Sequence, residues 1–122
     1  MAKKILIIED EETLRSMYVD KFSREGLNVI AAPDATEGLS LAKKENPDLI
    51  ILDMLLPEKN GIYFLEQLRN DPAISKTKVI AFSNYDGPDI KEETKKWGVK
   101  SYLIKTGYTP NQMVKKIKTY LK

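Results

Sequence analysis

Carboxylate side chains stand directly after two aliphatic runs of the sequence. Glu9 and Asp10 follow Ile5–Ile8, and Asp53 follows Leu49–Leu52. If these acids meet at one site, they repel one another, and without a compensating charge one of them holds a proton. A hard divalent cation resolves the conflict, because Mg²⁺ binds one or two carboxylates, keeps several waters and accepts phosphate oxygens. The pattern therefore indicates a site for Mg²⁺, or for Mn²⁺ in its place.

A hydroxyl group and an ammonium group follow two later apolar runs. Ser83 comes after Val79–Phe82, and Lys105 comes after Ser101–Ile104. A carboxylate beside a divalent cation, with a lysine opposite and a hydroxyl nearby, suits in-line phosphoryl transfer to the carboxylate. In this interpretation Asp53 attacks while the cation and Lys105 neutralise the phosphoryl oxygens. A structural ion pair between Lys105 and the acids accounts for the same residues without chemistry.

The composition excludes several other kinds of site. With 122 residues, 42% of them hydrophobic and 31% charged, the chain is expected to form one domain over residues 1–122. It has no cysteine and no histidine, which excludes disulfides, thiolate or imidazole metal sites and any phosphohistidine within the chain. No apolar run approaches the roughly 18 residues of a membrane helix, and no signal peptide is apparent. We therefore expect a cytoplasmic protein without membrane insertion.

Charge is distributed unevenly along the chain. Residues 1–61 carry a formal charge of −4 and residues 62–122 carry +6. After Glu93 there are eight lysines and no acid. Such a segment suits an acidic partner or nucleic acid. Because no aromatic-interleaved basic stripe or DNA-binding motif accompanies the lysines, we interpret them as solvated helix faces and do not expect nucleic acid as a partner.

Strand-like and helix-like segments alternate regularly. The expected strands are Ile5–Ile8, Asn28–Ala32, Leu49–Leu52, Val79–Phe82 and Ser101–Ile104, and each gap between them holds one stretch with helical periodicity. A fifth helix is expected after Thr109-Pro110. This alternation predicts right-handed βαβ units and a parallel sheet. Since sites in such sheets form beyond the carboxyl ends of the strands, the polar residues that follow the runs are expected to converge.

Helix boundaries are visible at several positions. Asp34, with Glu37 three residues later, predicts the start of the second helix. Gly61 is expected to open the third helix. The segment Asp89–Trp97 has the weakest apolar stripe, so we expect a loosely anchored helix with Trp97 as its end anchor and Gly98 as its stop.

The sequence resembles the receiver domain of bacterial two-component response regulators along essentially its whole length. The residues that carry the resemblance are Lys4–Glu11, Pro47–Asp53 with Pro57 and Gly61, Val79–Ser83 and Ser101–Lys105. The resemblance implies an α/β, flavodoxin-like, doubly wound fold. Its five parallel strands would follow the order 2-1-3-4-5, with five helices in a three-layer α/β/α arrangement.

The resemblance also implies a role for each acid. Asp53 would be the phosphoacceptor. Asp10 would bind Mg²⁺ directly, Glu9 would act largely through a metal-bound water, and the backbone carbonyl of Leu55 would supply another ligand. Glu9 stands where aspartate is commoner in the family, which adds one methylene of reach.

The resemblance also implies how the phosphoryl group would be sensed. Lys105 would pair with the phosphoryl group or with Asp53. Ser83 would bond a phosphoryl oxygen, and Tyr102 matches the aromatic position that changes rotamer. The surface formed by the last two helices and the last strand would then change, which is a population shift biased by one new dianion.

The implied partners belong to a signalling pathway. The phosphodonor would be a sensor histidine kinase, a histidine phosphotransfer protein or a small phosphodonor, and the altered surface would control a downstream protein. Pairing of two copies through that surface stays open. The protein would phosphorylate and dephosphorylate itself without being a metabolic enzyme. Since the sequence stops at Lys122 after the last helix, we expect either a receiver without an output domain or one domain of a longer protein.

Departures from the family pattern give two predictions. Thr106 follows Lys105 where the family usually has a proline after a cis bond. Because a non-proline cis bond costs about 3–4 kcal/mol, we expect a trans bond here, or a loop rebuilt through Gly107. Leu55 and Tyr85 should flank Asp53, and neither orients an attacking water, so self-dephosphorylation should be slow.

Three other functions compete with the receiver interpretation. A haloacid-dehalogenase-like phosphohydrolase needs a second acid two residues after its nucleophile, and that position holds Leu55. A flavodoxin-type carrier needs a phosphate-binding loop after the first strand, where this chain has four consecutive acids. A degenerate receiver that binds partners without phosphorylation is disfavoured by Asp10, Asp53 and Lys105, and only measurement separates it from an active one.

Overall fold

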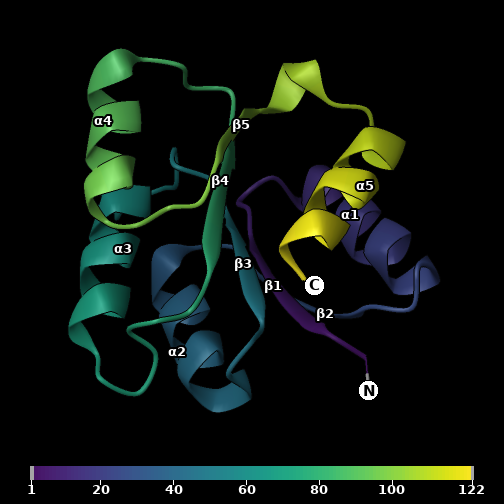
Figure 1. The fold of residues 1–122 in the computed structure, drawn as a ribbon, viewed down its shortest axis with the longest axis horizontal. Helices are drawn as coiled ribbons and strands as arrows, with labels where there is room; N and C mark the ends of the chain where they lie inside the picture. The colour runs from purple at the N-terminus through teal and green to yellow at the C-terminus, as the bar shows by residue number, and fades with distance from the viewer. Residues whose placement is uncertain (1, 122) are drawn as a thin grey trace.

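The computed structural model describes residues 2–121, and its centre is a five-stranded parallel sheet (Figure 1). The strands are β1 (Lys4–Ile8), β2 (Asn28–Ala32), β3 (Leu49–Leu52), β4 (Val79–Ser83) and β5 (Tyr102–Ile104). They lie in the order β2-β1-β3-β4-β5, and each neighbouring pair is parallel. The predicted flavodoxin-like topology is confirmed, and every predicted strand is present within one residue of its expected bounds.

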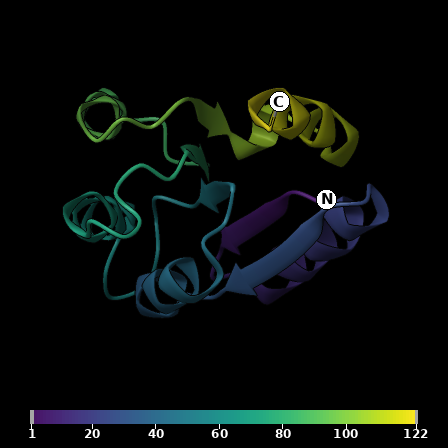
Figure 2. The same ribbon diagram turned by 60° about the horizontal axis from the view of Figure 1, so that its bottom comes forward.

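Five helices cover the two faces of the sheet. They are α1 (Glu12–Arg24), α2 (Ala35–Glu45), α3 (Gly61–Asn70), α4 (Pro88–Lys96) and α5 (Pro110–Tyr120), with a short 3-10 turn, η1 (Lys105–Gly107), before α5. Helices α1 and α5 lie on one face, and α2, α3 and α4 lie on the other, as predicted for a three-layer fold (Figures 1 and 2). No helix within residues 2–121 is long and apolar enough to cross a membrane.

The central strands explain why the sheet divides the core into two halves. Alternate side chains of a strand point to opposite faces. Ile5 and Ile7 of β1 therefore pack with α1 and α5, whereas Leu6 and Ile8 pack with α2 and α3. A continuous aliphatic run is what a strand needs when helices cover both its faces.

The predicted helix starts are present. Asp34 accepts a hydrogen bond from the backbone N–H of Glu37 at 2.8 Å, and Thr109 forms a reciprocal capping box with Gln112. Helix α3 begins at Gly61, as expected. These local signals fix where each helix enters the sheet and thereby the ends of the loops that carry the polar residues.

Helix α4 is held by an apolar face and by one arginine. Thr94 is buried, and Ile90 and Trp97 pack against the core, which confirms the predicted inner face. At the C-terminal end of the helix, the Arg69 guanidinium of α3 donates hydrogen bonds to the carbonyl oxygens of Trp97 (2.7 Å) and Gly98 (3.5 Å). Two further bonds reach the loop before β4, at Ser75 (3.1 Å) and Thr77 (2.6 Å). Arg69 thus ties α3, the loop before β4 and the end of α4 together, and this polar anchor was not predicted.

Replacing Arg69 with methionine should lower the free energy of unfolding by about 2–4 kcal/mol, because four carbonyl groups lose a charged donor while the apolar stem is kept. Urea unfolding measures the change. The matched control is Arg24→Met on the surface of α1, where an exposed pair with Asp20 should be worth less than about 1 kcal/mol. Equal losses in the two variants would contradict the anchoring role of Arg69.

Candidate functional site

Polar residues from four strand ends converge at one edge of the sheet. Glu9 and Asp10 follow β1, Asp53 follows β3, Ser83 ends β4 and Lys105 follows β5. A cleft at this edge is lined by eight residues: Glu9, Asp10, Glu11, Asp53, Leu55, Ser83, Asn84 and Lys105. The sheet therefore brings together the four strand ends that the sequence singled out.

The pairing of the central strands sets two carboxylates side by side. Ile8 of β1 is in register with Leu52 of β3, so the residues that follow the two strands are Glu9 and Asp53. The backbone N–H of Asp53 donates to the carbonyl of Ile8 at 3.0 Å, and that of Glu9 donates to the carbonyl of Ala32 at 3.0 Å. Regular strand pairing thus continues through both acids and fixes their positions.

The three acids form one cluster. Carboxylate oxygens of Glu9, Asp10 and Asp53 all lie within 4.8 Å of one another. Glu9 and Asp53 are only 5% and 6% exposed, whereas Asp10 is exposed to solvent. Three oxygen donors of this kind match the hard-cation chemistry expected from the sequence.

Lys105 supplies the positive charge that faces the two buried acids. Its ammonium group donates to Asp53 Oδ2 at 3.1 Å and forms a second, shorter hydrogen bond with Glu9 Oε1. Burial alone would lower the pKa of Lys105, but the hydrogen bond that Lys105 donates to Glu9 and the charge of Asp53 outweigh it and raise the pKa above its ordinary value. Lys105 is therefore charged at neutral pH.

Glu9 uses both of its carboxylate oxygens within the protein. Oε1 accepts from Lys105, and Oε2 accepts from the backbone N–H of Glu11 at 3.0 Å. Burial nevertheless raises the pKa of the Glu9 carboxyl above its usual range, and these two hydrogen bonds oppose the rise. Burial disfavours the charged form of both residues; it prevails at Glu9, whereas the acidic partners prevail at Lys105.

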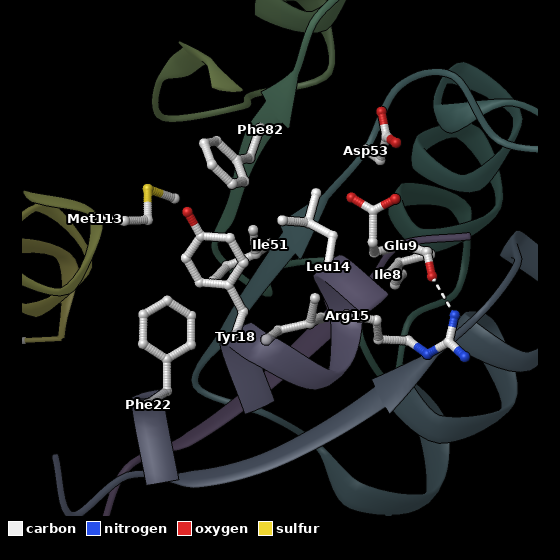
Figure 3. A pocket seen from close by; sticks show the side chains of 11 residues that line it. Ile8, Glu9, Leu14, Arg15, Tyr18, Phe22, Ile51, Asp53, Phe82 and Met113 are labelled. Carbon is white, nitrogen blue, oxygen red and sulfur yellow. Dashed lines mark hydrogen bonds between the residues drawn. The ribbon is translucent and has the colours of Figure 1, made fainter. Parts of the chain in front are cut away.

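Arg15 of α1 holds the backbone of the acidic loop by hydrogen bonds, a role that the sequence analysis did not predict. Its guanidinium donates to the backbone carbonyls of Glu9 at 2.8 Å and Asp10 at 3.3 Å. Figure 3 shows the first of these bonds beside an apolar cavity wall to which Tyr18 and Phe82 contribute. The signal was available, since an arginine one turn into the helix after an acidic loop is placed to reach back to that loop.

Ser83 and Tyr102 are connected through one backbone segment. Ser83 is completely buried, and its Oγ accepts from the backbone N–H of Tyr85 at 3.3 Å. The Tyr102 hydroxyl donates to the carbonyl of the same residue, Tyr85, at 2.6 Å. Burial raises the pKa of Tyr102, and the nearby Ser83 hydroxyl partly offsets this rise. The two predicted switch residues therefore meet at Tyr85.

The mouth of the cleft differs from the expectation at one position. Leu55 lines the cleft and is 54% exposed, as expected for a residue that flanks Asp53. Asn84 lines the cleft beside it, whereas the Tyr85 hydroxyl donates to Asp89 at 3.0 Å. A carboxamide is therefore present at the mouth, on the residue before the one that was predicted.

The turn after Lys105 agrees with the prediction for Thr106. Residues 2–121 contain no cis peptide bond, so the bond between Lys105 and Thr106 is trans. The chain enters η1 at Lys105, and the backbone N–H of Tyr108 donates to the Lys105 carbonyl at 3.3 Å. The lysine thus reaches the acids from a short 3-10 turn.

Replacing Lys105 with methionine should lower the free energy of unfolding by about 2–4 kcal/mol without divalent cations, because two buried carboxylates lose their shared cation. Urea unfolding in EDTA measures the loss. Adding Asp53→Asn to that variant should recover part of it, since one of the two opposed charges is then removed. A single-variant loss within about 0.5 kcal/mol of zero would contradict the stabilising role of Lys105.

Comparisons with known proteins agree with this arrangement. The response regulator receiver domain family model matches residues 5–118. The polar-differentiation response regulator DivK of Brucella ovis is 30% identical over 121 residues, which cover 99% of this chain and 98% of that protein. DivK of Brucella anthropi is similar to the same degree.

Solved structures show the same fold. The chemotaxis protein CheY4 of Vibrio cholerae has a TM-score of 0.91 and 26% identity, covering 99% of this chain and 100% of that one. A CheY-like receiver domain protein from Methanospirillum hungatei has a TM-score of 0.91 and 26% identity, covering 99% and 94%. With its sheet order, its acidic cluster and the extent of the family match, the chain belongs to the response regulator receiver domains of two-component signalling.

Proposed function

We propose that Asp53 accepts a phosphoryl group from a phosphohistidine on a sensor histidine kinase or a histidine phosphotransfer protein. The observation that carries the proposal is the contact of Lys105 with a carboxylate of an open cleft, where two further acids lie within 4.8 Å. A carboxylate oxygen of Asp53 forms the new P–O bond. The P–N bond of the donor breaks, and its electron pair returns to the donor imidazole. Because these 122 residues contain no histidine, the donor histidine lies outside them.

The side chains around Asp53 have distinct roles in this proposal. Asp53 Oδ1 accepts from the backbone N–H of Leu55 at 3.1 Å, and Oδ2 accepts from Lys105, so the carboxylate is oriented before the donor arrives. Lys105 then faces the negative charge that develops on the phosphoryl oxygens. Ser83 is placed to bond one of these oxygens once its hydroxyl leaves the Tyr85 N–H.

The acidic cluster fits Mg²⁺, or Mn²⁺ with the same preference for oxygen ligands. Asp10 and Asp53 would bind it directly, with the backbone carbonyl of Leu55 as a further ligand. Glu9 would act through a metal-bound water, which agrees with the engagement of both its oxygens inside the protein. The cation would supply positive charge against the acids and the phosphoryl oxygens.

The signal would leave the site through the segment between Ser83 and Tyr102. Movement of Ser83 toward the phosphoryl group frees the N–H of Tyr85, and the Tyr102 hydroxyl depends on the carbonyl of the same residue. A change there alters the surface of α4, β5 and α5, which we propose controls a downstream protein. A second candidate, a receiver that binds partners without phosphorylation, is favoured by the Lys105–Glu9 pair, which forms without a phosphoryl group.

Phosphorylation can be tested by intact-mass spectrometry after incubation with Mg²⁺ and acetyl phosphate. We expect a single phosphoryl increment that is absent after Asp53→Asn or with EDTA and is released by hydroxylamine, as an acyl phosphate requires. The matched control is Asp20→Asn, an exposed aspartate of α1 that should leave the increment unchanged. An increment that persists after Asp53→Asn would show that Asp53 is not the acceptor.

The lifetime of the phosphoryl group tests the mouth of the cleft. Leu55→Asn should shorten the half-life roughly two- to tenfold, because the carboxamide can orient a water for attack. Asn84→Ala is the comparison variant, since Asn84 already lines the cleft. A half-life unchanged by Leu55→Asn but lengthened by Asn84→Ala would assign the control of hydrolysis to Asn84 and refute the role of Leu55.

A further inference from the structure

Two lysines of α4 lie on one side of the helix. Lys91 and Lys95 are four residues apart and lie on the same side. Lys91 faces β5, because its ammonium group stands 5.7 Å from the ring centre of Tyr102. Asp89 and Glu93 are each two residues away from a lysine and so lie on nearly the opposite side of the helix, whereas the exposed Glu92 lies beside Lys95 at the outer margin. The flank of α4 that faces β5 therefore carries two lysines, with Glu92 as the acid at its margin.

Helix α5 presents the same chemistry from the other side of β5. The Tyr120 hydroxyl is hydrogen-bonded to Ser101, which directly precedes β5, so this flank of α5 faces the strand. The Lys116 ammonium stands 6.0 Å from the ring centre of Tyr120. Lys118, on the other flank, pairs with Glu25 of α1 at 2.9 Å. One lysine of α5 thus points toward the edge of the sheet and another is neutralised away from it.

Together these residues form a surface that we call the basic edge: Lys91, Lys95 and Lys116 with the rings of Tyr102 and Tyr120. Figure 2 shows α4, β5 and α5 in a row along one border of the molecule. Strand β5 is the last strand of the sheet and pairs only with β4, so its outer side has no neighbouring strand within residues 2–121. The basic edge is therefore open to a partner.

Positive charge predominates at the basic edge, although Glu92 lies beside Lys95 on α4. None of its three lysines forms a salt bridge within residues 2–121, in contrast to Lys4, Lys43, Lys105 and Lys118. No aspartate or glutamate follows Glu93 in the sequence. Two of the lysines are held over tyrosine rings, a cation–π arrangement that limits the side-chain entropy lost on binding.

We infer that the basic edge binds an acidic segment of a partner protein. Complementary charge steers such an encounter and rejects basic partners. Carboxylates suit the site better than nucleic acid, because the chain's only arginines, Arg15, Arg24 and Arg69, lie on α1 and α3 and leave the edge without the forked donors that phosphates favour. The role of this surface in signalling rests on the proposed function, whereas binding itself can be measured without phosphorylation.

Fluorescence anisotropy on unphosphorylated protein can test the inference. The probe is a labelled peptide of four Glu-Glu-Leu repeats, with Gln-Gln-Leu repeats as the neutral counterpart. Changing Lys91, Lys95 and Lys116 together to glutamine should weaken binding of the acidic peptide about tenfold, and the loss should shrink at high salt. The neutral peptide should bind weakly to every variant. Circular dichroism confirms that the variants are folded.

The matched control removes three other exposed lysines, Lys3, Lys44 and Lys76, which form no salt bridge within residues 2–121. Equal weakening in this control would reduce the effect to net charge and overturn the inference. It would also be overturned by tighter binding of a DNA duplex, or by a self-association that the basic-edge variant abolishes. Because the peptide is bound by unphosphorylated protein, a failure of phosphorylation and a failure of this inference are distinguishable.

Discussion

One lysine between two buried carboxylates is the interaction on which the functional end of this receiver domain depends. Strand pairing holds Glu9 and Asp53 side by side, and each is almost completely buried. Two unpaired acids in such a place are costly, and Lys105 makes their positions tolerable. Asp10 brings a third carboxylate into the cluster, so the site keeps an excess of negative charge even with Lys105 present. That excess is the physical reason why a cation would fit here, and why the proposed phosphoryl group would need both positive charges.

The architecture was predictable because its causes are local and repeated. Aliphatic runs such as Ile5–Ile8 and Leu49–Leu52 describe strands covered on both faces, and their regular alternation with helices leaves few topologies. The convergence of the acids and Lys105 follows from parallel strands having their carboxyl ends at one edge. Arg69 and Arg15 were not predicted, because an arginine that binds backbone carbonyls leaves no periodic signal and its acceptors depend on how distant loops meet.

The path of a loop is also difficult to predict from the sequence. Sequence reasoning placed Tyr85 at the mouth of the cleft, whereas Asn84 lines it and the Tyr85 hydroxyl bonds to Asp89. A shift of one position in the loop changes which side chain can bind a water at the cleft, since a carboxamide stands where a phenol was expected. The trans bond before Thr106 was predictable, because it follows from an intrinsic energy of the peptide bond and not from the path of a loop.

If Asp53 is phosphorylated as proposed, the separation of charge in the molecule constrains how this modification would reach a partner. A phosphoryl group adds negative charge at the acidic cluster, and its direct field would weaken the attraction between the basic edge and an acidic segment. Solvent ions screen exposed charges over about 8 Å at physiological salt, so this field is a poor signal. Contact is the stronger route, because Lys91 stands over the Tyr102 ring and the Tyr102 hydroxyl is bound to the segment that begins at Ser83. A rotation of that ring would move the surface beneath a lysine, so the partner would sense packing at β5 and not the charge of the phosphoryl group itself.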